Sequence, residues 1–127
     1  LQWDDHEVRD NWYETRDLSK DDRYKVKSMA LLAARARQAF LEFNPLAFDA
    51  ADAERIHRVV RYGPLVDIFA IDLRSYRGGN SANMQPTLTD DARIFGAAQL
   101  EILKSQLAAS RAVWKIVASD MPIGLKP

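Results

Sequence analysis

The residue types that can do chemistry are concentrated near the N-terminus, where residues 3–12 read WDDHEVRDNW. Two neighbouring carboxylates, Asp4 and Asp5, repel each other unless they are well solvated or a cation neutralises them. Carboxylate, imidazole and amide groups are ligands for Ca, Mg, Mn, Fe or Zn, and a nearby guanidinium such as Arg9 can bind an anionic substrate. The segment therefore predicts a metal site, with a solvated acidic loop as the alternative.

The composition excludes several other classes of site. The chain has 127 residues, the size of one ordinary domain. Lys plus Arg and Asp plus Glu both number 18, so the basic excess typical of a nucleic-acid binder is missing, and no nucleic-acid partner is expected. A minor alternative is nucleic-acid binding through the arginines at 55, 58, 61, 74 and 77.

The sequence has no cysteine, which excludes thiolate metal sites and cysteine nucleophiles. No apolar run approaches the length of a membrane span.

The elements that must position the acidic segment follow it in the chain. Residues 1–24 fit neither hydrophobic period and predict a loop. Residues 22–43 predict a helix that ends at Asn44-Pro45, because the residue before proline avoids helical angles. Its apolar residues recur every three or four positions and predict one buried stripe, made of Val26, Met29, Ala33, Ala36, Phe40 and Phe43.

The second half of the chain predicts a mixed sheet. Residues 56–62 and 65–72 are strand-like and predict a hairpin through Gly63-Pro64, and a surface loop follows at 78–91. Residues 96–110 predict a helix whose buried stripe is Leu100, Leu103 and Leu107. Residues 113–119 predict a third strand with Trp114 in the core. Because a helix connects strands 65–72 and 113–119, we expect these two strands to be parallel and the fold class to be α/β.

Two further features carry less specific chemistry. Asp72, Arg74, Tyr76 and Arg77 follow a strand, where α/β sites often lie, but an Asp–Arg pair at such a place more often fixes a loop. We expect His57 to be an exposed strand residue and Gly78-Gly79 to form a turn rather than a phosphate cradle.

The acidic segment resembles a known family signature. WDDHEVRDNW is similar to the WDDHE–NNW signature of PhoD-like alkaline phosphatases (alkaline phosphatase D), a branch of the calcineurin-like metallophosphoesterases. Two supporting blocks also resemble the family. One joins residues 61–65 (RYGPL) to 72–77 (DLRSYR), and the other joins a G-x-x-Q helix at 96–99 to residues 107–115 and 119–125.

The resemblance implies a fold and a place for this chain within it. The fold implied is an α/β/β/α sandwich with flanking helices, of which residues 1–127 form a single region and a central fragment. The family's site also uses an Asp from an earlier segment and histidines of a later G-D-x-H motif. This chain has only His6 and His57 and no such motif. It also starts at Leu1 and not at Met, so we expect a fragment of a longer protein, with a small complete domain as the alternative.

The resemblance also implies roles for individual residues. Asp5 is expected to be a metal ligand within the catalytic centre, and Asp4 a further ligand or an acid that orients one. His6 is expected to contact phosphate and to assist the leaving group. Asn11 and, more weakly, Arg9 are expected to contact substrate. Glu7 is expected to support the loop.

The function implied is metal-dependent hydrolysis of phosphomonoesters or phosphodiesters, in which an activated water attacks phosphorus. The family resemblance implies calcium and iron as the metals and a periplasmic or secreted location. This fragment is expected to be incomplete for catalysis. The alternative is a non-catalytic binding module on the same scaffold, because the earlier Asp and the G-D-x-H segment are missing.

Overall fold

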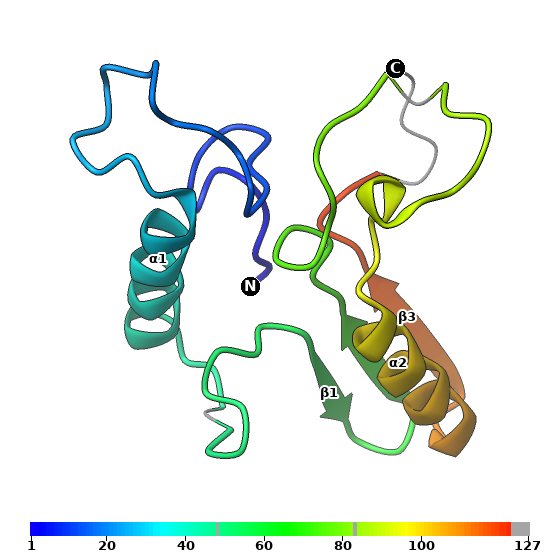
Figure 1. The fold of residues 1–127 in the computed structure, drawn as a ribbon. Coiled ribbons are helices and arrows are strands. Elements are labelled where there is room, and N and C mark those ends of the chain that lie inside the picture. Colours follow the sequence, from blue (N-terminus) through cyan, green and yellow to red (C-terminus); the bar gives the residue numbers. More distant parts are fainter. Residues whose placement is uncertain (48, 83, 123–127) are drawn as a thin grey trace.

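The computed structural model describes residues 1–47, 49–82 and 84–122, and these residues form two lobes (Figure 1). The α1 lobe (residues 1–47) holds the N-terminal loop and one helix. The sheet lobe (described residues from 58 to 122) holds three strands and a second helix. In chain order the elements are α1 (Met29–Phe43), β1 (Arg58–Tyr62), β2 (Val66–Ala70), the 3₁₀ turn η1 (Asp90–Ala92), α2 (Ala97–Ala109) and β3 (Trp114–Ala118). The expected α/β class is confirmed, and neither helix within the described ranges is suited to crossing a membrane.

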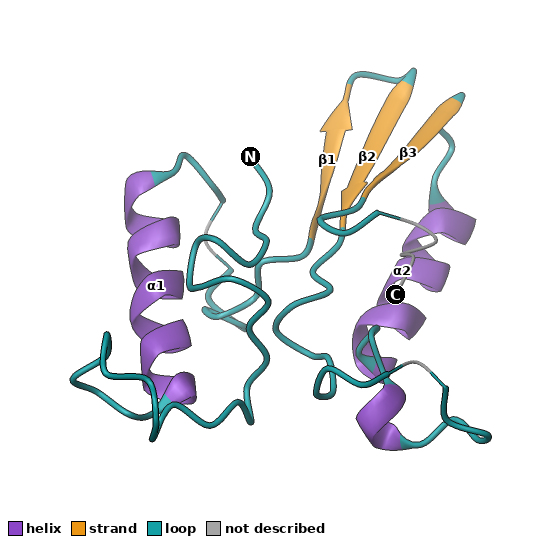
Figure 2. Ribbon diagram, turned by 90° about the horizontal axis from the view of Figure 1, so that it is seen from above, coloured by secondary structure: helices purple, strands orange, loops and turns teal. Residues whose placement is uncertain are grey.

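The sheet has the predicted mixed topology, with strand order β1-β2-β3. β1 and β2 form an antiparallel hairpin in which Tyr62 faces Val66, and Gly63 adopts a φ of +66° in the connecting turn. β3 lies parallel to β2, and α2 makes the connection between them beside the sheet (Figure 2). The parallel pairing brings the carboxyl ends of β2 and β3 to the same edge of the sheet, so the loops that follow them lie close together.

Helix α1 is shorter than the sequence predicts, because it starts at Met29 and not near residue 22. Ser28 has extended backbone angles, and its hydroxyl accepts the N–H of Leu31 at 3.2 Å, which satisfies a donor of the first turn. The helix ends where expected, at Asn44, whose side chain donates to the carbonyl of Phe40.

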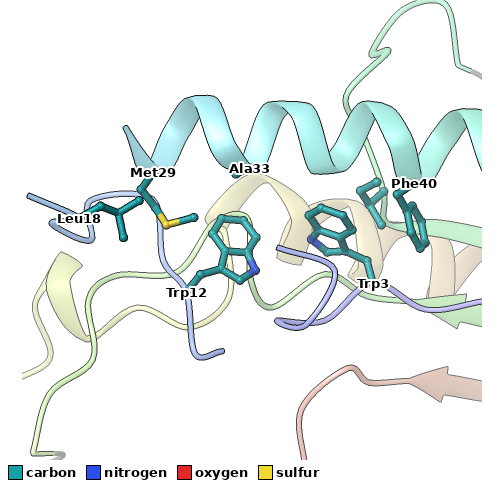
Figure 3. Close-up of a cluster of buried hydrophobic side chains, with 7 residues drawn as sticks. Trp3, Trp12, Leu18, Met29, Ala33 and Phe40 are labelled. Atoms are coloured by element: carbon teal, nitrogen blue, oxygen red, sulfur yellow. The ribbon is translucent and has the colours of Figure 1, made fainter. Parts of the chain in front are cut away.

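The main core lies between α1 and the irregular N-terminal loop (Figure 3). Trp3 and Trp12 are fully buried, with their ring centroids 6.0 Å apart in an edge-to-face arrangement, and Trp3 also packs edge-to-face on Phe40 at 5.3 Å. Leu18, Met29, Ala33 and Ile56 complete this cluster. Two tryptophans thus hold the acidic segment between them against the helix, even though that segment forms neither helix nor strand.

The predicted stripe of α1 is correct only in part. Met29, Ala33 and Phe40 are buried, but Val26 precedes the helix and Phe43 is 86% exposed. Phe43 is the last residue of α1, and it is not among the hydrophobic residues that pack on the tryptophan cluster.

Two predictions for the sheet lobe are wrong. Trp114 is 67% exposed and not in the core, because β3 is an edge strand that no other described element covers on that side. In α2 the buried residue is Gln99, whereas Leu100 is exposed and Leu103 and Leu107 are half-buried. A second, smaller core in this lobe contains Ile71, Leu73 and Met121.

Three further predictions concern His57, the loop at 78–91 and the block at 119–125. His57 is half-buried and precedes β1, so it is not an exposed strand residue. Residues 78–91 form the expected loop, apart from the start of η1 and the undescribed residue 83. In the block at 119–125, residues 123–125 lie outside the described residues.

The two phenylalanines of α1 provide a matched test of this core. Phe40→Ala should lower the free energy of unfolding by about 3–5 kcal/mol, because it leaves a cavity beside Trp3. Phe43→Ala, an identical change three residues later, should alter it by less than about 0.5 kcal/mol. Urea denaturation followed by circular dichroism measures both, and equal losses would show that the core is wrongly placed.

Candidate functional site

The acidic segment forms a compact turn that begins at Asp5. The Asp5 carbonyl accepts the backbone N–H groups of Val8 and Arg9 at 2.9 and 2.7 Å. Glu7 accepts the backbone N–H of Asp4 at 2.8 Å, a contact that supports the loop as expected. The indole of Trp12 donates to the Asp4 carbonyl at 3.3 Å, so the buried tryptophan fixes the start of the turn from its far end.

Three side chains of this turn present a cluster of potential metal ligands. One ligand atom each from Asp5, His6 and Asp10 lies within 4.8 Å of the other two. The Nε2 atom of His6 is 3.9 Å from both Asp5 Oδ1 and Asp10 Oδ1. The side chains of His6 and Asp10 are 79% and 71% exposed, whereas Asp5 is buried. Two carboxylates and an imidazole fit a divalent or trivalent cation, and the open side leaves room for further ligands.

Asp5 is held in its ionised form. Burial by itself would raise the pKa of Asp5, but the N–H of Asn11 and the charges of Arg74 and His6 outweigh burial and keep that pKa below its ordinary value. The Asn11 N–H donates to Asp5 Oδ2 at 2.8 Å, from a left-handed backbone with φ of 49°. A carboxylate that stays ionised at neutral pH is the form that a cation requires.

Arg74 from the sheet lobe reaches the acidic segment. Its Nε donates to Asp4 Oδ1 at 2.8 Å, its Nη1 donates to Asn11 Oδ1 at 3.3 Å, and its Nη2 lies 3.5 Å from Asp5 Oδ2. The residue is only 5% exposed. One buried guanidinium therefore pairs with both adjacent carboxylates and offsets part of the repulsion that the sequence predicts between them.

The structure brings most of the predicted site residues together, with one exception. Asp4, Asp5 and Asn11 meet at Arg74, and His6 adjoins Asp5. Arg9 turns the other way: its Nη1 is 3.2 Å from Asp21 Oδ2, and its guanidinium lies over the ring of Tyr24. The Arg9 side chain is buried, and these two residues engage its guanidinium.

Sequence reasoning missed two residues of this arrangement. Asp10 lies four positions after His6, a spacing that can place two side chains on one side of a turn, and this spacing is the signal that could have found it. Arg74 lies 70 residues from Asp4, and its place after a strand indicates a loop-fixing role more readily than a role in the site.

A second pair of acids, Asp72 and Asp120, lies just after β2 and β3, respectively. Asp120, just after β3, accepts the backbone N–H of Leu73 at 2.8 Å. The pKa of Asp120 is raised to about 6, chiefly by burial and also by the negative charges of Asp72 and Asp4, against two backbone hydrogen bonds that lower it. Asp120 is therefore partly protonated in mildly acidic solution.

Comparison with known proteins relates nearly all of the chain to one family. A family model described as PhoD-like phosphatase matches residues 1–126. Alkaline phosphatase D of Bacillus subtilis (strain 168) is 30% identical over 130 residues, which cover 94% of this chain and 21% of that protein. A solved structure of PhoD superposes with a TM-score of 0.69 at 27% identity, over 93% of this chain and 24% of that chain. The chain thus spans less than a quarter of the length of either relative.

Asp120 gives the protein a testable pH dependence. An acid whose pKa is higher in the folded state than its unfolded value of 3.8 stabilises the fold when protonated, and this contribution disappears as pH rises through 6. Asp120→Asn should therefore stabilise the protein at pH 8 by on the order of 1 kcal/mol, since solvent still reaches part of the carboxyl. At pH 4 the variant should differ little from the wild type.

Urea denaturation at the two pH values measures this difference, with Asp22→Asn as the control at an exposed acid. If Asp120→Asn changes the free energy of unfolding equally at pH 4 and pH 8, the pKa of Asp120 is not raised in the folded protein.

Proposed function

The chain belongs to the PhoD-like phosphatase family, and we propose on this premise that it carries part of the site of a metal-dependent phosphoester hydrolase. The observation that supports the proposal best is the cluster of Asp5, His6 and Asp10 within the segment that resembles the family signature. The substrates proposed are phosphomonoesters or phosphodiesters of small molecules, and a location outside the cytoplasm is part of the same proposal.

The donor atoms fit the proposed cation. Asp5 and Asp10 offer oxygen atoms, which suit calcium or iron, and the imidazole of His6 adjoins both carboxylates. Asp4 lies beside them as the acid that shares Arg74 with Asp5. A cation held there would supply positive charge against the phosphoryl oxygens and would lower the pKa of the attacking water.

The side chains of the loop would bind and orient the substrate. His6 is exposed, so its imidazole can contact a phosphoryl oxygen and deliver a proton to the leaving alkoxide. Asn11, beside Asp5, is exposed and can offer its amide to the substrate. We assign Arg9 to the support of the loop, because Asp21 and Tyr24 already engage its guanidinium.

A non-catalytic binding module on the same scaffold is the second candidate. The observation in its favour is the small number of histidines, since His6 and His57 are the only two in the 127 residues. The cluster would then bind a cation or a phosphate group without turnover. Hydrolysis by the protein in its full encoded length separates the two candidates.

Substitutions in the cluster test the proposed function. Asp5→Ala and His6→Ala should each lower kcat/KM for a chromogenic phosphomonoester by about 100-fold or more, because each removes charge or proton transfer at the reacting phosphoryl group. Asp22→Ala removes an exposed acid outside the cluster and should leave the rate unchanged. Cluster variants that keep the wild-type rate would refute the assignment.

A further inference from the structure

Building on the proposed hydrolase function, we propose that Arg74 is a positioning residue, which orients the Asp5 carboxylate so that its Oδ1 atom faces His6 on the open side of the site. Arg74 itself would contact neither substrate nor cation. Its role would be to fix the orientation of a ligand before any cation arrives.

The two oxygen atoms of Asp5 have different surroundings. Oδ2 accepts the Asn11 N–H at 2.8 Å and lies 3.5 Å from Arg74 Nη2. Oδ1 lies 3.9 Å from the exposed imidazole of His6. Donors that hold Oδ2 on the inner side leave Oδ1 on the side where the other ligand atoms are. The orientation of the carboxylate is therefore set by protein donors.

Arg74 is suited to this role because its guanidinium contacts three residues of one loop at once. Nε, Nη1 and Nη2 approach Asp4, Asn11 and Asp5, respectively. A rigid planar fork fixes the relative positions of these three side chains, whereas the point charge of a lysine ammonium could not. The side chain is only 6% exposed, so it would be a poor direct contact for substrate.

The backbone that carries Arg74 is itself held at two points. Asp72, fully buried after β2, accepts the N–H groups of Arg74 and Ser75 with its Oδ1 at 3.0 and 2.9 Å. The Gln99 amide of α2 accepts the Asp72 N–H at 2.9 Å and donates to the Asp72 carbonyl at 2.8 Å. These contacts form a chain of support from α2 through β2 to the acidic segment. They also explain why the buried residue of α2 is a glutamine.

The test compares Arg74→Ala and Arg74→Lys with the control Arg61→Ala, which removes an exposed arginine of β1. The protein in its full encoded length is titrated with Ca²⁺ alone and with Fe³⁺ alone by calorimetry, and hydrolysis of a chromogenic phosphomonoester is followed in parallel. Both Arg74 variants should lose about 10–100-fold in affinity for the cation that the wild type binds, as expected when a residue that orients a ligand is removed. Arg61→Ala should bind as the wild type does.

Rescue distinguishes positioning from general stabilisation. Millimolar guanidinium, which can enter the space left in Arg74→Ala, should restore part of the cation affinity, whereas tetramethylammonium should not. Arg74→Lys keeps the charge, so it provides a folded variant if Arg74→Ala does not fold, and its affinity should still fall.

Each contrary result has a distinct meaning. Unimpaired cation affinity in both Arg74 variants, beside an active wild type, would overturn the positioning role alone. Guanidinium that restores the melting temperature but not the affinity would overturn it as well. A wild type that binds neither cation and hydrolyses no phosphoester would overturn the proposed function and this role with it.

Discussion

The ion pairing between Arg74 and the acidic segment is the interaction on which the site depends. Asp4 and Asp5 are adjacent, and Asp5 is buried, so without a counter-charge their repulsion and desolvation would oppose folding. Arg74 is equally unfavourable as a lone buried cation. The opposite charges of Arg74 and the two aspartates therefore offset part of each other's cost of burial. The same contacts, at 2.8 and 3.5 Å, fix the N-terminal loop against the end of β2.

Aromatic packing holds an irregular segment in place, as the proposed metal site would require. The segment has neither helix nor strand, yet Trp3 and Trp12 at its two ends are fully buried against α1. Because the polar residues lie between these anchors, the turn cannot shift without exposing a large apolar surface. Helix α1 thus provides the apolar surface on which both tryptophans pack, and this packing holds the N-terminal loop in place.

Local patterns in the sequence predicted the elements well and the tertiary contacts poorly. Gly63 and the alternation around it specify the hairpin, and the helix between β2 and β3 specifies their parallel pairing. Exposure of Phe43 and Trp114 was not predictable, because it depends on what covers each element and not on its own period. Asp4, Asp5, His6 and Asn11 were named as candidates from their residue types and the family resemblance, and their roles remain predictions. Arg74 was not assigned to the site, since only the fold brings it to Asp4.

The two apolar clusters are separate: one lies under α1, and the other, around Ile71 and Leu73, lies in the sheet lobe. Contacts between the lobes at the site are polar, including the Arg74 pairs and the bond from Asn80 to the Asn11 carbonyl. Separate cores with polar contacts between them imply that the chain opens in more than one cooperative unit, and that amide exchange in α1 and β2 reports different opening free energies. The candidate site lies where these units meet, so local opening of either one would separate its residues.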